Sequence, residues 1–390
     1  MLTGIHHWQR QERIIYGRPC DAAVRDEVAR IGAQRVFICT TRSLTREPGG
    51  IVDRIQKALG ASYVGRFDAM PAHSPRPAVI ACAAAAREAK ADLLVAVGGG
   101  SVIDAVKVVQ LCLWRNLTAP DDLDAYITGY NVGHKAAAWE RETPSVRAIA
   151  VPTTFSGAEF TTFGGVTDTR TGIKSSVGFK NQIPISVILD PAATLATPLW
   201  LLLSTGMRAV DHCIECYLSP NAQPFADATS VHALKMLLRA LPRLKEQPDD
   251  LANRLDCQMA MWISILGLSV GVSVGASHGI GRVMGGLFGV PHGRTSCVTL
   301  APVLRWNAPV NAVRQAELAD AVGLKHANLA DSVADLVHRL GEPERLGEVG
   351  VGRDKFAELA EKCLASGYLA ANPRPIKSAA DIIEILELAA

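Results

Sequence analysis

Short strand-like runs alternate with amphipathic stretches through the first half of the chain. The runs suit strands of a buried sheet and lie at 13–17, 35–39, 62–68, 93–97, 146–151 and 185–189. Between the earlier runs, apolar residues recur at helical spacing over 20–32, 50–59 and 78–89. Strands that alternate with helices predict an α/β domain with a parallel sheet.

The pattern changes near Asp190-Pro191, where the apolar runs give way to helical periodicity. Helices are predicted over 199–218, 224–243, 250–271, 273–288, 296–304, 308–322, 327–340, 353–363 and 379–389. Strand candidates are scarce after this point. The sequence therefore predicts an α/β domain over 1–190 and an all-α helical domain over 191–390.

The central feature of the first domain is a strand that runs into three glycines. Gly98, Gly99 and Gly100 follow the apolar run 93–97 directly, and Ser101 stands where the N-cap of the next helix is expected. Glycines let a backbone approach a ligand, and a helix N-terminus offers free N–H groups to an anion. We interpret the loop as a phosphate cradle; the alternative is a tight turn without a ligand.

Composition and charge exclude several classes of protein. The 390 residues carry a net charge of +2 without a basic tract, so neither a nucleic acid nor a membrane surface is expected as a partner. Nine scattered cysteines are not a disulfide framework and suit a reducing cytoplasm. Cys213 and Cys216 form a CxxC within an apolar helical pattern and are interpreted as small core residues, with a redox or zinc pair as the alternative.

Polar side chains gather in two places in the helical domain. Arg208 and His212 are four residues apart and share a helix face, as do His278 and Arg282. His292 follows a glycine-rich bend. Three histidines in one domain can converge on a divalent metal, although each taken singly can be a core or capping residue.

Four ordered motifs carry a resemblance to a known family. GGGSVIDAVK (98–107), VPTTFSGAE (151–159), GMRAVDHCIECYLS (206–219) and SHGIGRVMGGLFGVPHG (277–293) resemble the iron-containing (group III) alcohol dehydrogenases. The resemblance implies a Rossmann-like dinucleotide-binding domain, a helical domain, dehydroquinate synthase-like architecture and a homodimer. The turn His73-Ser74-Pro75 and the short loop GLFGVPHG are similar to the maleylacetate reductase branch.

The resemblance also implies roles for individual residues. The cofactor-binding positions match Gly98, Gly99, Gly100, Ser101, Asp104, Lys107, Thr153 and Thr154. The family usually holds its metal with one Asp and three His, and the His positions match His212, His278 and His292. The Asp position is Arg208 here, and a further His position near the nicotinamide is Arg282.

These two departures decide the functional prediction. At about 4 Å, a pair of unit charges near a protein surface interacts by about 4 kcal/mol, so Arg208 turns attraction for a cation into repulsion. A guanidinium cannot ligate, and two of them can hold a carboxylate instead. The maleylacetate reductase branch has likewise lost the Asp ligand, but it usually has Asn there and usually lacks Asp104.

Cofactor choice depends on the end of the second strand. Members that prefer NAD tend to carry Asp where Thr41 stands, and that carboxylate would repel a 2′-phosphate. Thr41 removes this repulsion and Arg42 can pair with the phosphate, so NADPH is allowed beside NADH. The alternative for Arg42 is a solvated loop residue.

We therefore predict reversible hydride transfer between NADH or NADPH and a small carbonyl compound that bears a carboxylate or another anionic group. Arg208 and Arg282 would hold the anion and polarise the carbonyl oxygen, and one of His212, His278 and His292 would donate the proton. The first alternative is a metal-dependent alcohol dehydrogenase with Fe²⁺ or Zn²⁺ on the three histidines and Asp211. The others are a cofactor-binding protein without turnover and phosphate elimination of the dehydroquinate synthase kind.

Overall fold

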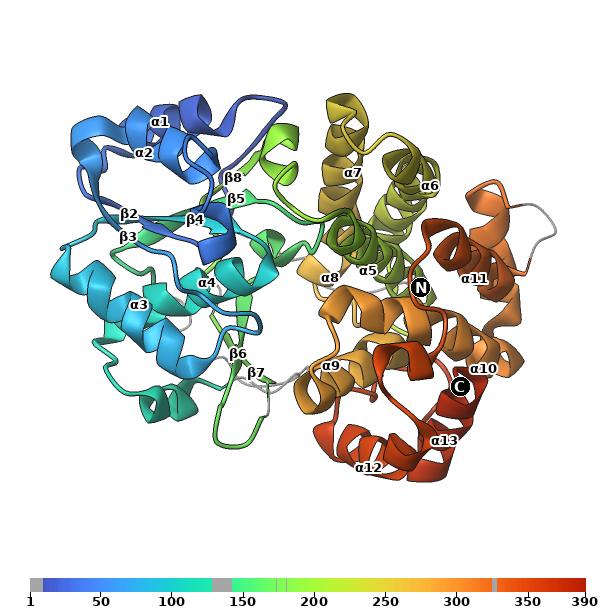
Figure 1. Ribbon diagram of the computed structural model, residues 1–390. Coiled ribbons are helices and arrows are strands. Elements are labelled where there is room, and N and C mark those ends of the chain that lie inside the picture. Colours follow the sequence, from blue (N-terminus) through green and yellow to red (C-terminus); the bar gives the residue numbers. More distant parts are fainter. Residues whose placement is uncertain (1–9, 128–141, 173, 180, 325–327) are drawn as a thin grey trace. The chain divides into compact units, whose positions relative to one another are not determined.

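The chain folds into two compact units (Figure 1). The computed structural model describes residues 10–127, 142–172, 174–179, 181–324 and 328–390. The first unit ends at Thr197, and the second runs over Pro198–Ala390. Each unit has its own core and is considered by itself.

The first unit is built on a parallel sheet. Its strands are β1 (Arg13–Tyr16), β2 (Val36–Cys39), β3 (Tyr63–Phe67), β4 (Leu93–Gly98), β5 (Arg147–Pro152) and β8 (Ser186–Leu189), in the order β1-β8-β5-β4-β2-β3. All five pairings between neighbouring strands are parallel. The predicted parallel α/β fold of this unit is confirmed, with strand bounds that agree to within one or two residues.

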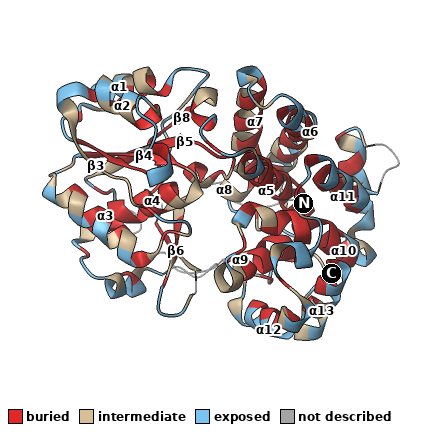
Figure 2. Ribbon diagram, viewed as in Figure 1, coloured by how far each residue is buried: buried red, intermediate tan, exposed pale blue. Residues whose placement is uncertain are grey.

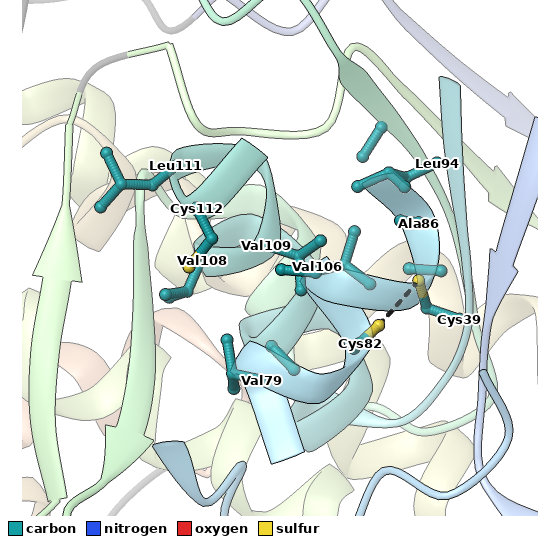
Figure 3. Close-up of a cluster of buried hydrophobic side chains, with 14 of the residues drawn as sticks. Cys39, Val79, Cys82, Ala86, Leu94, Val106, Val108, Val109, Leu111 and Cys112 are labelled. Carbon is teal, nitrogen blue, oxygen red and sulfur yellow. Dashed lines mark hydrogen bonds between the residues drawn. The ribbon is translucent and has the colours of Figure 1, made fainter. Parts of the chain in front are cut away.

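Helices cover both faces of the sheet because the strand side chains alternate between them. These helices are α1 (Cys20–Ile31), α2 (Ile51–Leu59), α3 (Arg76–Glu88) and α4 (Gly100–Arg115). Val36 and Ile38 point into the core under α1 and α2. Phe37 and Cys39 point into the core under α3 and α4, where the Cys39 and Cys82 sulfurs lie 3.4 Å apart (Figure 3). The strands β4 and β8 are buried along their length, and β5 is buried from Ala148 onward (Figure 2).

A two-stranded antiparallel hairpin was not predicted. It consists of β6 (Phe163–Thr167) and β7 (Lys174–Gly178). The segment carries Gly164, Gly165, Ser175 and Ser176, so it shows no apolar alternation that would have marked a strand. Its position is set by tertiary contacts, since a Cβ at Gly164 would lie 2.5 Å from the backbone oxygen of Asp104.

The strand order reverses direction between β2 and β4. From β2 the chain continues to the edge strand β3, whereas from β4 it continues to β5 on the opposite side. Open α/β sheets bind ligands beyond the carboxyl ends of the strands at such a point. The residues at this position are those that follow Cys39 and Gly98.

The second unit is helical among its described residues. Its helices are α5 (Leu199–Leu218), α6 (Pro224–Glu246), α7 (Leu251–Ser264), α8 (Leu266–Ser269), α9 (Ala276–Phe288), α10 (His292–Ala321), α11 (Leu329–Leu340), α12 (Phe356–Ser366) and α13 (Ala379–Leu388). The two helices predicted over 296–304 and 308–322 form α10, with a break at Asn311, where φ is −138°. The single helix predicted over 250–271 is divided into α7 and α8.

None of the described helices combines the length and the hydropathy that a membrane span requires. All nine cysteines are buried free thiols, and the interpretation of Cys213 and Cys216 as core residues agrees with their full burial on α5.

Candidate functional site

The three-glycine turn between β4 and α4 has no room for side chains. The φ angle of Gly98 is +156°, and a Cβ there would lie 2.7 Å from Val102 Cγ2. A Cβ on Gly99 would lie 2.9 Å from Thr154 Cγ2, and one on Gly100 would lie 2.9 Å from Ser156 Oγ. The first N–H groups of α4 have no acceptor within the helix, so this turn presents backbone donors at the switch point of the sheet.

The predicted N-cap role of Ser101 is wrong. The helix begins at Gly100 with Gly99 as its N-cap, because the turn at Gly98 is tight enough to start the helix at once. The Ser101 hydroxyl instead accepts the His73 N–H at 3.0 Å, and its carbonyl accepts the Ser74 hydroxyl at 2.7 Å. These two hydrogen bonds fix the turn His73-Ser74-Pro75, which resembles the maleylacetate reductase branch, against the first turn of α4.

Further predicted cofactor residues lie on α4 and directly after β5. Thr153 and Thr154 follow β5 and are buried. Lys107 is fully buried and donates to the Ala158 carbonyl at 2.8 Å, while its ammonium lies 3.1 Å from Asp104 Oδ1. Lys107 thus links α4 to the segment that follows β5.

A second buried titratable group, the carboxyl of Glu159, lies beside this lysine. Neither carboxyl oxygen of Glu159 has a hydrogen-bond partner among the described residues. Burial raises the pKa of Glu159 to about 8, against the opposing attraction of Lys107. Burial likewise lowers the pKa of Lys107 despite the neighbouring Asp104.

Thr41 and Arg42 lie at the other side of the switch point. Thr41 follows β2 by two residues and forms an isolated bridge with Ala69. Arg42 begins a short 3₁₀ turn, Arg42–Leu44, and is exposed. Both residues thus lie beyond the carboxyl end of the strand next to β4.

In the helical unit, glycines let three helices approach each other closely. A Cβ on Gly293 of α10 would lie 2.6 Å from the backbone of Ser204 on α5. A Cβ on Gly281 of α9 would lie 2.6 Å from Thr295 Oγ1 on α10. These close approaches bring polar side chains of α5, α9 and α10 into one buried place.

We call this group the buried polar cluster: Arg208, Asp211, His212, Glu215, Ser277, His278 and Ser296. Asp211 Oδ2 accepts the hydroxyls of Ser277 at 2.8 Å and Ser296 at 2.6 Å. The Arg208 guanidinium donates to Ser296 Oγ at 2.9 Å and lies 3.6 Å from Asp211 Oδ2. The cluster therefore contains a buried ion pair that a serine hydroxyl bridges.

Two histidines of the cluster have opposite electrostatic surroundings. Burial and the positive charges of His278 and Arg208 hold the pKa of His212 well below its usual range. Burial and Arg208 also oppose the charged form of His278, but the carboxylates of Asp211 and Glu215 outweigh them and raise its pKa. The two ring centroids are 5.0 Å apart. His278 is therefore the better proton donor of the two near neutral pH.

Three buried polar atoms of this cluster have no hydrogen-bond partner among the described residues. They are Asp211 Oδ1, His212 Nδ1 and His278 Nε2. Buried polar groups are nearly always paired, so orphaned atoms in one place indicate a polar group that is supplied by a ligand or by water.

Two predicted residues of this unit are less buried than the cluster. The Arg282 guanidinium is 4.6 Å from the centre of the Tyr368 ring, and the residue is partly exposed. His292 is exposed at the first position of α10. The three histidines that the resemblance pairs with a metal are therefore not equivalent, because only His212 and His278 belong to the buried polar cluster.

The donor set does not fit the metal site that the resemblance implies. Within the described parts of the chain, one group of three potential ligand atoms lies within 4.8 Å, from Asp211, Glu215 and His278. Most of its oxygens already accept N–H or O–H groups, and the Arg208 charge lies beside it. The guanidinium of Arg208 therefore puts a positive charge, on a group that cannot ligate, where the resemblance implies a carboxylate ligand.

The sequence did not single out every member of the cluster. Glu215, Ser277 and Ser296 received no role, although Glu215 lies on the same helix as Asp211, one turn later. The signal that could have identified Glu215 is a carboxylate within an apolar helix, because acidic side chains are almost never fully buried unless they are paired. The serines carried no signal of this kind.

Sequence comparisons identify relatives of both units. Residues 11–191 match the family described as "Iron-containing alcohol dehydrogenase", and residues 202–390 match "Fe-containing alcohol dehydrogenase family, C-terminal". A maleylacetate reductase of Sphingobium indicum is 29% identical over 366 residues, 93% of this chain and 91% of its own length. A 4-hydroxybutyrate dehydrogenase of Cupriavidus necator is 31% identical over 374 residues, 93% of this chain and 94% of its own.

Solved structures give the same picture. A putative alcohol dehydrogenase of Ralstonia eutropha has a TM-score of 0.84 at 27% identity and covers 100% of this chain and 98% of its own. A maleylacetate reductase of Agrobacterium tumefaciens has a TM-score of 0.81 at 25% identity, with the same coverage.

Proposed function

The chain belongs to the iron-containing alcohol dehydrogenase family, and we propose that it reduces a small carbonyl compound bearing a carboxylate without a bound metal. Members of this family are oxidoreductases of alcohol and carbonyl groups. A nicotinamide cofactor, when bound, supplies the hydride. The remaining steps fall to the side chains of this chain.

One observation carries the metal-free part of the proposal. The family's carboxylate ligand is replaced by Arg208, and that guanidinium is already engaged with Asp211 and Ser296. A cation added beside this buried ion pair would meet the fixed positive charge of Arg208. In the proposed enzyme, Arg208 therefore takes the place of the metal's charge.

The roles of the side chains follow from their surroundings. His278, with its raised pKa, donates a proton from Nε2 to the oxygen of the reduced carbonyl. The positive charge of Arg208 stabilises negative charge as it develops on that oxygen. Arg282, which is partly exposed, pairs with the substrate carboxylate.

The cofactor in this proposal is NADH or NADPH, held at the glycine turn. The backbone donors of Gly99 and Gly100 would receive the pyrophosphate. Thr41 carries no negative charge that would repel a 2′-phosphate, and Arg42, the next residue, is exposed and would pair with this phosphate. The proposal therefore includes NADPH as an accepted cofactor.

A second candidate is a metal-dependent alcohol dehydrogenase or aldehyde reductase. The observation that favours it is the group formed by Asp211, Glu215 and His278, whose ligand atoms lie within 4.8 Å of one another. In that enzyme, Asp211 would supply the carboxylate ligand that is missing at position 208, where this chain has arginine.

One experiment separates the candidates. The purified protein is treated with a chelator, its iron and zinc are measured by elemental analysis, and oxo-carboxylic acids and uncharged aldehydes are offered with NADH and with NADPH. We expect turnover without metal, no gain from added Fe²⁺ or Zn²⁺, and a preference of at least about tenfold for the oxo acids, since a charged hydrogen bond contributes about 1.5 kcal/mol or more.

Other outcomes contradict the proposal. One tightly held iron or zinc per chain that turnover requires would favour the metal-dependent enzyme. Cofactor binding, seen as a change in NADPH fluorescence, without oxidation by any carbonyl compound would favour a binding protein.

A further inference from the structure

Glu215 belongs to the buried polar cluster but has no role in the proposed reaction. Its Oε1 accepts the Ser277 N–H at 2.8 Å, and its Oε2 accepts the Gly275 N–H at 2.9 Å. The same Oε2 lies 2.7 Å from His278 Nδ1. A single buried carboxylate therefore holds both the start of α9 and the imidazole ring that α9 carries.

This carboxylate replaces a capping side chain. The N-cap residue of α9 is Gly275, which has no side chain to accept the first N–H groups of the helix. A Cβ at this position would lie 3.0 Å from Glu215 Oε1, so the approach of α5 to this helix end favours glycine. The position of His278 is thus fixed from α5 through Glu215.

The contact also selects the tautomer of the ring. A carboxylate only accepts hydrogen bonds, so the proton must lie on His278 Nδ1. Asp211 Oδ2 is 3.3 Å from the same Nδ1, but it already accepts the Ser277 and Ser296 hydroxyls. With Nδ1 engaged, Nε2 is the ring atom that can exchange a proton, and it has no partner among the described residues.

We propose that Glu215 is a positioning residue, which keeps a proton on His278 Nδ1 whether the ring is neutral or charged, so that the proton given to the substrate is the second one, on Nε2. The inference deepens the proposed function and rests on it where His278 is taken as the donor. Glu215 touches neither substrate nor cofactor in this scheme; it acts through the ring.

The test is Glu215→Gln, because the amide cannot satisfy the same contacts. Both carboxylate oxygens accept N–H groups, so either orientation of glutamine sets its NH₂ against a donor. At a pH where the ring of His278 carries one proton, we expect that proton to move from Nδ1 to Nε2, as read by two-bond ¹⁵N–¹H NMR of the imidazole. We also expect kcat for carbonyl reduction to fall at least tenfold, while KM for the nicotinamide cofactor changes less than twofold.

Asp227→Asn is the matched control, since this carboxylate of α6 pairs with Arg314 at 2.6 Å. It removes a carboxylate ion pair from the same unit and should leave the tautomer and kcat unchanged. Glu215→Asp keeps the negative charge on a side chain that is one methylene shorter. Relative to Glu215→Gln, it should therefore restore part of kcat and the proton on His278 Nδ1.

The outcomes separate this inference from the proposed function. An unchanged tautomer and an unchanged kcat in Glu215→Gln would overturn the positioning role. A neutral His278 ring without a proton on Nδ1 in the wild-type protein would also overturn it. This second measurement does not depend on whether the variant folds. The expected tautomer shift in a protein that reduces no carbonyl compound would support the positioning geometry and overturn the proposed function alone.

Discussion

The glycine turn of the α/β unit and the buried polar cluster of the helical unit are built in opposite ways. The turn presents backbone N–H groups. Its glycines are required because a Cβ on Gly99 or Gly100 would lie too close to Thr154 or Ser156. The cluster places charged side chains, and each depends on the others: Asp211 on Ser277, Ser296 and Arg208, and His278 on Glu215.

This difference has a physical consequence for how each site tolerates change. A backbone site is defined by space, so a single added atom affects it locally. A buried charge cluster is defined by balance, so the loss of one member leaves its partner without compensation in a low-dielectric interior. We therefore expect substitutions in the cluster to affect folding and those in the turn to affect ligand binding.

The largest effect is expected for Arg208→Asp, which restores the family's carboxylate. It leaves Asp211 without its ion-pair partner and adds a further buried carboxylate, so the free energy of unfolding should fall by about 3 to 5 kcal/mol. Urea denaturation measures this loss.

The control for that variant is Arg305→Asp, which breaks an exposed pair with Asp331 and should cost about 1 kcal/mol or less. If both variants lose the same stability, the cluster does not depend on balanced charge. Recovery of stability in Arg208→Asp on adding Zn²⁺ would indicate that the arginine alone excludes a metal.

A smaller effect, on binding alone, is expected for Gly99→Ala. The added methyl group would lie 2.9 Å from Thr154 Cγ2 and would force the turn to shift. We expect the Kd of NADPH to rise about tenfold, or about 1.4 kcal/mol, as measured by fluorescence titration. Gly347→Ala, where a Cβ meets nothing within 4 Å, is the control. An unchanged Kd would mean that the turn does not hold the cofactor.

The smallest effect is a shift in pH dependence. The carboxylates raise the pKa of His278 above 6.5, so the reduction rate should fall as pH rises through that raised value and the donor loses its proton. The stability that the charged ring contributes is present below pH 6.5 and is lost over the same rise. Asp211→Asn removes one negative charge and should move the fall in kcat to lower pH. A pH profile that stays in place would exclude His278 as the donor.

The sequence by itself determined the α/β unit and most helix positions, because these follow from local periodicity. The apolar run that ends at Gly98 and the helical spacing over 199–218 needed no distant partner to be recognised. It did not reveal the hairpin of β6 and β7, whose short polar strands are held by contacts with α4. Nor did it place the N-cap of α4, which the backbone turn at Gly98 decides.

Within the candidate site, the sequence identified Arg208 as the decisive replacement, since one charge reversal is visible without a structure. Only the tertiary structure decided what that charge meets: Asp211 from its own helix and Ser296 from α10, with Glu215 directed at His278 on α9. Pairing of this kind joins residues up to 88 positions apart, and it depends on how closely the helices approach at glycines such as Gly293. Local spacing determines which side chains share a helix face, whereas helix packing determines which charges neutralise each other.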